Sequence, residues 1–73
     1  MRISVFGLGY VGTVSVGCLA DGGHHVVGVD VNRDKVQSLD TGIAPIVEPR
    51  VAELIEKAHR GGRLEATTAT AEA

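Results

Sequence analysis

Short apolar runs alternate with segments of helical periodicity along this chain. The runs are typical of buried parallel strands, and the segments between them repeat apolar residues at i, i+3 and i+4. Glycine pairs and prolines separate the elements. The pattern predicts, in order, strand Arg2–Phe6, helix Tyr10 to about Ala20, strand His25–Asp30, helix Arg33–Asp40, helix Pro49 to about Arg60 and strand Arg63–Thr68.

This order predicts an α/β fold, a Rossmann-like β-α-β-α-α-β half with three parallel strands. Right-handed crossovers place these strands in the order 3-2-1. A complete doubly wound domain contains two such halves. The chain has 73 residues, enough for one half. A core this small barely offsets the entropy of ordering the chain, so we expect marginal stability.

Apolar spacing also predicts which helix faces are buried. In the first helix we expect the buried face to carry Val11, Val14, Cys18 and Leu19, which makes Cys18 a core thiol rather than a nucleophile. In the third helix the expected buried stripe is Val51, Leu54, Ile55 and Ala58. Asn32 is expected to cap the second helix. Glu48 either caps the third helix or helps to shape a cofactor pocket.

Three glycines follow the first strand in the spacing G-x-G-x-x-G. Gly7 permits a tight turn, Gly9 leaves room for a pyrophosphate, and Gly12 lets the helix pack closely on the strands. The next helix begins here, so the backbone N–H groups of Tyr10 and Val11 and the positive end of the helix dipole favour a phosphate. The spacing predicts a dinucleotide site; the alternative is a glycine-rich turn without a ligand.

Asp30 ends the second strand, eighteen positions beyond Gly12. An acid at this place accepts hydrogen bonds from the adenosine ribose hydroxyls of NAD. Its charge also repels a 2′-phosphate, which favours NAD over NADP by roughly a thousandfold without a compensating cation. Arg33 and Lys35 are the possible compensators. Lys35 is either a solvated helix charge or a contact to the adenosine end of the cofactor.

Composition excludes several other classes of function. The net charge is −2 and no Lys/Arg cluster is present, so nothing indicates nucleic-acid binding. A single cysteine forms no internal disulfide, which favours the reducing cytoplasm. No run approaches the roughly 18 apolar residues of a membrane span. The three histidines show no metal-ligand spacing; His24 and His25 are expected at the rim opposite the glycine turn, and His59 near a helix C-terminus.

These residues together resemble the nucleotide-sugar 6-dehydrogenase family, which includes the UDP-glucose and GDP-mannose enzymes. Gly-Tyr-Val-Gly followed by Pro-Ile-x-Glu-Pro is far more specific than the glycine spacing. The resemblance is carried by Phe6-Gly7-Leu8-Gly9-Tyr10-Val11-Gly12, Cys18-Leu19, Gly23-His24, Gly28-Val29-Asp30, Lys35-Val36, Gly42, Pro45-Ile46-Val47-Glu48-Pro49, Arg63-Leu64 and Thr67-Thr68. The family usually has Gly-Leu after Glu-Pro, whereas this chain has Arg50-Val51.

The resemblance implies an NAD-dependent, two-step oxidation of a sugar C6 alcohol to a carboxylate. The details are most similar to the GDP-mannose branch, whose product, GDP-mannuronate, is the precursor of alginate. By the family pattern Tyr10, Val11, Asp30 and Lys35 would contact NAD. The family's catalytic cysteine, its lysine and its sugar-nucleotide pocket lie downstream of these residues, and Cys18 does not match that cysteine. No catalytic residue is therefore expected here.

The expectation for residues 1–73 is thus the N-terminal part of an NAD-binding Rossmann domain, inactive alone, with the nucleotide sugar bound only through domains beyond it. The first strand would then be an exposed apolar edge, which predicts that the isolated 73-residue chain self-associates or is partly unfolded. Two alternatives remain open for the function: a segment of a UDP-glucose 6-dehydrogenase, or a non-catalytic NAD-binding module.

Overall fold

The computed structural model describes residues 1–69, so the last four positions of the expected 1–73 segment lie outside the described residues. The elements, in chain order, are β1 (Arg2–Phe6), α1 (Tyr10–Asp21), β2 (His25–Val29), α2 (Arg33–Asp40), α3 (Pro49–Arg60) and β3 (Leu64–Thr67). All six elements predicted from the sequence are present. No helix among residues 1–69 is long and apolar enough to cross a membrane.

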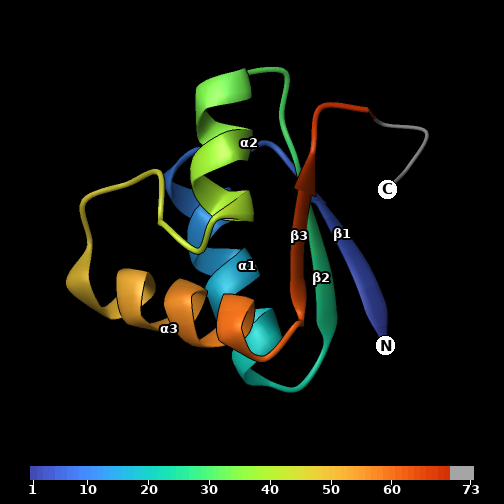
Figure 1. Ribbon diagram of the computed structural model, residues 1–73, viewed down its shortest axis with the longest axis vertical. Helices are drawn as coiled ribbons and strands as arrows, with labels where there is room; N and C mark the ends of the chain where they lie inside the picture. Colours follow the sequence, from blue (N-terminus) through green and yellow to red (C-terminus); the bar gives the residue numbers. More distant parts are fainter. Residues whose placement is uncertain (70–73) are drawn as a thin grey trace.

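The three strands form one parallel sheet in the order β1-β2-β3, with β2 in the centre. Ile3 pairs with Val26 across β1 and β2, and Val26 pairs with Leu64 across β2 and β3. All three helices lie on one face of this sheet (Figure 1). The predicted fold class and strand order are therefore confirmed.

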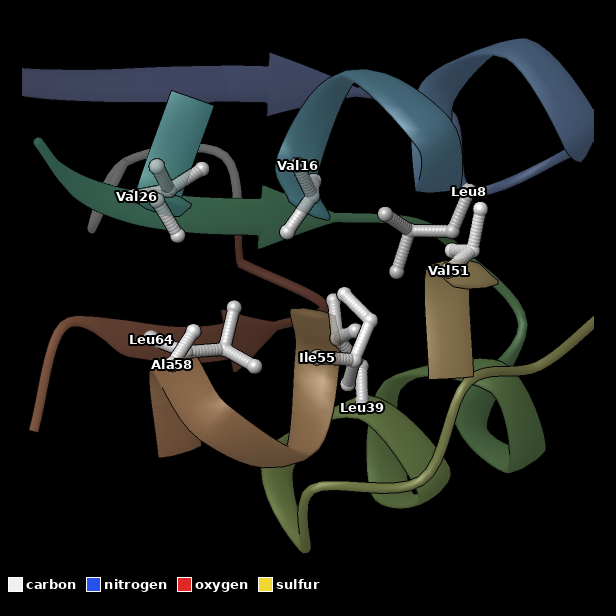
Figure 2. Packing of buried hydrophobic residues seen from close by; sticks show 9 residues of the cluster. Leu8, Val16, Val26, Leu39, Val51, Ile55, Ala58 and Leu64 are labelled. Carbon is white, nitrogen blue, oxygen red and sulfur yellow. The ribbon is translucent and has the colours of Figure 1, made fainter. Parts of the chain in front are cut away.

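The core fills the space between the sheet and the three helices (Figure 2). Leu8, Leu39 and Ile55 are completely buried in it and come from the β1–α1 turn, α2 and α3. Val26 contributes the sheet side of the same cluster. Because side chains alternate along a strand, Val27 points to the opposite face. Because Leu8 is buried in this cluster, the β1–α1 turn is part of the core and not a surface loop.

The buried face of α1 differs from the predicted one. Thr13, Val16, Gly17 and Ala20 are buried, whereas Val11 is 77% exposed. Cys18 is exposed as well, so the prediction of a core thiol was wrong. Apolar residues lie on nearly every side of α1, and periodicity alone cannot choose among them. Close packing against α3 decides the face, because a Cβ on Gly17 would lie only 3.3 Å from the Cβ of Leu54.

Side chains cap the N-termini of α2 and α3 as expected. The Oδ1 atom of Asn32 accepts hydrogen bonds from the N–H groups of Asp34 and Lys35 at 2.9 and 3.2 Å. The Oε1 atom of Glu48 accepts one from Arg50 N–H at 3.2 Å, which favours the capping role among the two considered. The stripe of α3 is confirmed for Val51, Ile55 and Ala58, which are buried, while Leu54 is half-buried.

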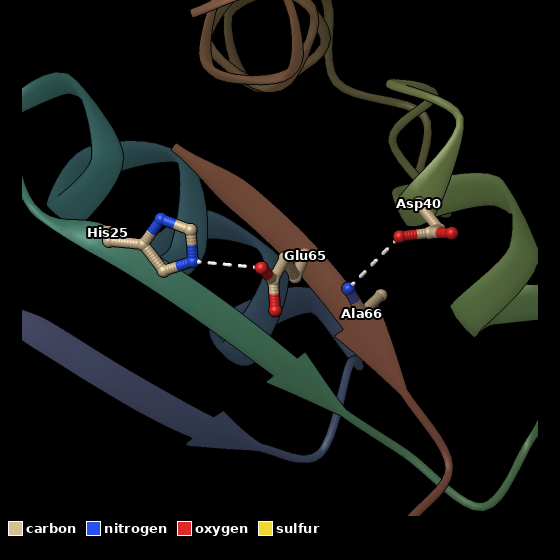
Figure 3. A network of polar contacts seen from close by, with 4 residues as sticks. All are labelled: His25, Asp40, Glu65 and Ala66. Carbon is tan, nitrogen blue, oxygen red and sulfur yellow. Dashed lines mark hydrogen bonds and ion pairs between the residues drawn. The ribbon is translucent and has the colours of Figure 1, made fainter. Parts of the chain in front are cut away.

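Polar contacts cross the outer part of the sheet at β3 (Figure 3). His25 Nε2 lies 3.3 Å from Glu65 Oε1, joining β2 to β3. The N–H of Ala66 donates to Asp40 Oδ1 at 3.3 Å, so a residue at the end of α2 accepts from the outer edge of β3. Within the described residues β1 pairs only with β2.

Candidate dinucleotide-binding site

The turn between β1 and α1 is shaped by two of the three glycines. Gly7 has φ +92°, a conformation that other residues rarely adopt, and its N–H donates to the carbonyl oxygen of Val29 at 2.7 Å. A Cβ on Gly12 would lie 1.8 Å from the carbonyl oxygen of Gly7. The turn therefore requires a glycine at both positions, one for the backbone angle and one for close contact with the helix.

The first turn of α1 has no side-chain cap. Its N-cap is Gly9, and the first turn contains no acidic residue. The first hydrogen bond of the helix runs from Thr13 N–H to the carbonyl oxygen of Gly9 at 3.0 Å. Within residues 1–69, no acceptor is found for the N–H groups of Tyr10, Val11 and Gly12. These donors and the positive end of the helix dipole suit an anion.

Asp30 lies beside this turn, directly after β2. Its Oδ2 atom accepts a hydrogen bond from Leu8 N–H at 2.7 Å, and its Oδ1 atom accepts one from Asn32 N–H at 2.8 Å. These bonds, first the one from Leu8, hold the pKa of Asp30 below its ordinary value of 3.8, and the positive charge of Lys35 adds to the effect. Partial desolvation opposes the shift but does not reverse it. The carboxylate is therefore ionised at neutral pH, with lone pairs left on both oxygens.

Lys35 is half-buried in the first turn of α2. Its backbone N–H is held by the Asn32 cap, and its charge acts on Asp30. The structure therefore brings Lys35 to the Asp30 side of the molecule. Both alternatives for this residue, a solvated charge and a ligand contact, are compatible with that position.

A hollow of about 340 Å³ adjoins the Asp30 carboxylate. Its walls come from the carboxyl ends of the strands and the residues just after them: Phe6, Gly7, Val29, Asp30, Val31 and Thr68. Phe6 is 62% and Val31 91% exposed, so two large apolar side chains lie open here. Sequence reasoning missed Phe6, Val31 and Thr68 as wall residues. Their position at the ends of strands was the available signal, because ligands of open α/β sheets bind at that edge.

The seven residues predicted to bind the cofactor share one region of the fold. Gly7, Gly9, Tyr10, Val11 and Gly12 form the β1–α1 turn and the start of α1, while Asp30 and Lys35 lie in and after the β2–α2 connection. Both connections lie at the upper end of the sheet in Figure 1. Thr13, which sequence reasoning missed, is buried beneath this turn. Its signal was a hydroxyl that directly follows Gly12, the last glycine of the turn motif.

The other residues considered for chemistry lie apart from this edge. His25 pairs with Glu65 near the beginning of β2, and His59 is in the last turn of α3. No group of three or more His, Cys, Asp or Glu side chains in the described part of the chain could hold a metal ion.

Comparisons with known proteins agree on one family. The model of the UDP-glucose/GDP-mannose dehydrogenase family, NAD binding domain, matches residues 1–73. The GDP-mannose 6-dehydrogenase of Pseudomonas syringae pv. syringae is 53% identical over the whole chain. The UDP-glucose 6-dehydrogenase AglM of Haloferax volcanii is 53% identical over 68 residues, 93% of this chain and 16% of that protein. This chain spans only 17% of the length of the Pseudomonas relative.

A solved structure gives the same result at the level of the fold. The ternary complex of GDP-mannose dehydrogenase from Pseudomonas aeruginosa superposes with a TM-score of 0.90 at 51% identity, covering 93% of this chain and 16% of that one. The fold and its glycine turn thus define a Rossmann-type NAD-binding domain. The chain belongs to the UDP-glucose/GDP-mannose dehydrogenase family, and NAD is the cofactor of the matched domain.

Proposed function

We propose that residues 1–73 form the N-terminal part of that domain and bind NAD at the carboxyl edge of the sheet. The pyrophosphate lies against the unpaired N–H groups of Tyr10, Val11 and Gly12, and Gly9 leaves open space for it. Asp30 accepts hydrogen bonds from the adenosine ribose. The observation that carries this proposal is the direct bond between Leu8 N–H and Asp30, which sets the phosphate turn beside the ribose acid.

The hollow beside Asp30 supports a place for the adenine ring. Phe6 and Val31 present apolar surface there, and an aromatic base gains from leaving water on such walls. Lys35 then lies on the adenosine side and offsets part of the negative charge of Asp30. Gly7 and Gly12 do not contact the cofactor by side chains; they allow the turn to exist.

For the whole protein we propose the function of a nucleotide-sugar 6-dehydrogenase in the cytoplasm. The enzyme would oxidise GDP-mannose to GDP-mannuronate with two NAD, and this product is a precursor of alginate-type polysaccharides. Identity to GDP-mannose 6-dehydrogenases over the full 73 residues supports this substrate. A UDP-glucose 6-dehydrogenase is the second candidate, because the Haloferax enzyme of that name has the same 53% identity. The residues described here contribute cofactor binding, and the choice of sugar belongs to other parts of the protein.

Calorimetric titration of the intact protein with NAD and NADP tests the proposal. Wild type should bind NAD and discriminate against NADP. The variant Asp30→Ala should bind NAD at least about tenfold more weakly and lose most of the discrimination, because the ribose acceptor and the repulsive charge disappear together. Asp34→Ala removes the same charge from the exposed first turn of α2 and is the matched control, with NAD affinity unchanged.

Two results would contradict the proposal. A wild-type protein without measurable NAD affinity would remove the function itself. An Asp30→Ala variant that binds NAD as tightly as Asp34→Ala would remove the role of Asp30.

We also propose that the 73-residue chain self-associates through β1. Among the described residues β1 has one neighbouring strand, and Phe6 at its end is 62% exposed. The open edge of a sheet is a template for another strand. Sedimentation of the 73-residue chain should show concentration-dependent assembly, and a compact monomer at all concentrations would contradict this part.

A further inference from the structure

We propose that Thr13 is a positioning residue for the dinucleotide turn and acts through the backbone of Leu8. The proposal deepens the NAD-binding function and rests on it. Thr13 does not line the hollow beside Asp30, and its side chain is completely buried. Its influence on a ligand is therefore indirect.

Both hydrogen bonds that Thr13 donates end on the turn. Its Oγ1 hydroxyl donates to the carbonyl oxygen of Leu8 at 3.2 Å, in a buried position. Its backbone N–H donates to the carbonyl oxygen of Gly9 at 3.0 Å. In the described part of the chain Thr13 is the buried polar side chain of an otherwise apolar interior. A polar group retained in such a place needs a partner, and here that partner is the glycine turn.

Leu8 is held from the other side by Asp30. Its N–H donates to Asp30 Oδ2 at 2.7 Å, and its side chain is completely buried in the core. The N–H and the carbonyl of Leu8 belong to the two peptide planes that flank its Cα. Each plane is rigid, so a hydrogen bond to each of them restrains φ and ψ at Leu8.

Fixing Leu8 sets the direction of the chain into Gly9 and the start of α1. The N–H groups of Tyr10 and Val11 follow after Gly9, so the conformation of Leu8 contributes to their orientation toward a phosphate. A ligand that meets donors already oriented does not have to order them on binding. Thr13 and Asp30 therefore clamp Leu8, and the clamp links the phosphate donors to the ribose acid.

The variant Thr13→Val tests the clamp, because valine fills similar space without a hydroxyl donor. In calorimetric titration of the intact protein, the Kd for NAD should rise about fivefold to tenfold, as expected when a preorganising bond is lost. Thr13→Ser keeps the hydroxyl and should bind NAD within about twofold of wild type. Hydrogen exchange of the Leu8 amide in the ligand-free protein should be faster in Thr13→Val and normal in Thr13→Ser.

Val16→Ala is the control for general loss of stability. Val16 is on the same buried face of α1, one turn further on, and its side chain is completely buried. This variant should lower the Tm at least as much as Thr13→Val and leave the Kd for NAD and Leu8 exchange unchanged. If Thr13→Val does not fold, Thr13→Cys replaces it, since a thiol is a weak donor and should give an intermediate Kd.

The outcomes separate the two proposals. NAD affinity in Thr13→Val within twofold of wild type, or an equal loss in Val16→Ala, would overturn the clamp. A wild type that binds no NAD would overturn the proposed function, and Leu8 exchange in the ligand-free variants would still decide whether Thr13 holds the turn.

Discussion

Helices α1 and α3 both have 12 residues and pack against each other on the same face of the sheet, yet the residues at their termini differ. Helix α3 begins with a Glu48 cap and Pro49 and has Lys57, His59 and Arg60 in its last turn. Helix α1 has Gly9 as its N-cap, without a side-chain cap, and no charged residue in its first turn. The uncapped donors of α1 face the proposed cofactor site. The missing cap of α1 is thus informative, because the neighbouring helix α3 has a side-chain cap, an N-terminal proline and basic residues in its last turn.

The largest effect is expected from a methyl group at Gly12. In Gly12→Ala the new Cβ would meet the carbonyl oxygen of Gly7 at 1.8 Å, and this oxygen is a backbone atom that cannot rotate away as a side chain could. We expect a loss of about 4 kcal/mol or more in the free energy of unfolding, measured by thermal denaturation. Gly9→Ala is the control, because its Cβ would meet nothing within 4 Å, and it should cost at most about 1 kcal/mol. Equal stability of the two variants would show that the turn can move.

A smaller loss of stability is expected when a buried side chain of α3 is truncated, and almost none when an exposed side chain of α1 is truncated. Ile55 of α3 is completely buried, so Ile55→Ala should cost about 3 kcal/mol. Val11 of α1 is 77% exposed, so Val11→Ala should change stability by less than about 0.5 kcal/mol. Urea denaturation of both variants measures the difference. If Val11→Ala lowered the free energy of unfolding about as much as Ile55→Ala, Val11 would belong to the buried face of α1, as the sequence predicted.

Substitutions at the two N-caps should change stability by a smaller amount, and in opposite directions. Glu48→Ala removes the acceptor of Arg50 N–H and should destabilise the protein by about 1 kcal/mol. Gly9→Ser adds a cap to α1 and should stabilise the ligand-free protein by a few tenths of a kcal/mol. The new hydroxyl would occupy an N–H needed by the pyrophosphate, so NAD affinity should fall. A Gly9→Ser variant with normal NAD affinity would separate the uncapped start of α1 from ligand binding.

The smallest effect is expected from acid. The pKa of Asp30 is below 3.8 in the folded protein because Leu8 and Asn32 donate to its carboxylate. A lowered pKa contributes stability that is complete above pH 3.8 and is lost as the pH falls through the folded-state pKa. As the pH falls through the folded-state pKa, the Leu8 amide should lose protection, measured as its exchange rate relative to the intrinsic rate at the same pH, while amides of α3 keep their protection. The variant Asp30→Asn should not show this acid-dependent change in Leu8 exchange. If the variant still showed the change, the titrating group would be another residue.

Sequence patterns predicted the elements of this fold because each carries its own local signals. Asn32 and Glu48 lie directly before helices, where capping residues are preferred, and residues 26–29 of β2 form a continuous apolar run. The face of α1 could not be predicted, since it depends on the approach of Leu54 to Gly17 and not on any contrast within the helix. The glycine turn and Asp30 were predicted together, but the bond between Asp30 and Leu8 was not. That bond depends on the register of two strands and on a backbone angle that no spacing specifies.

The position of Leu8 links the stability of the folded protein to the binding of NAD. Its side chain is buried in the core while its backbone carries the turn, so the site cannot open without disturbing the interior. Ligand binding and folding are then linked equilibria. NAD at a hundred times its Kd would stabilise the folded state by about 2.7 kcal/mol. Resistance of this domain to proteolysis would therefore rise and fall with the supply of its cofactor.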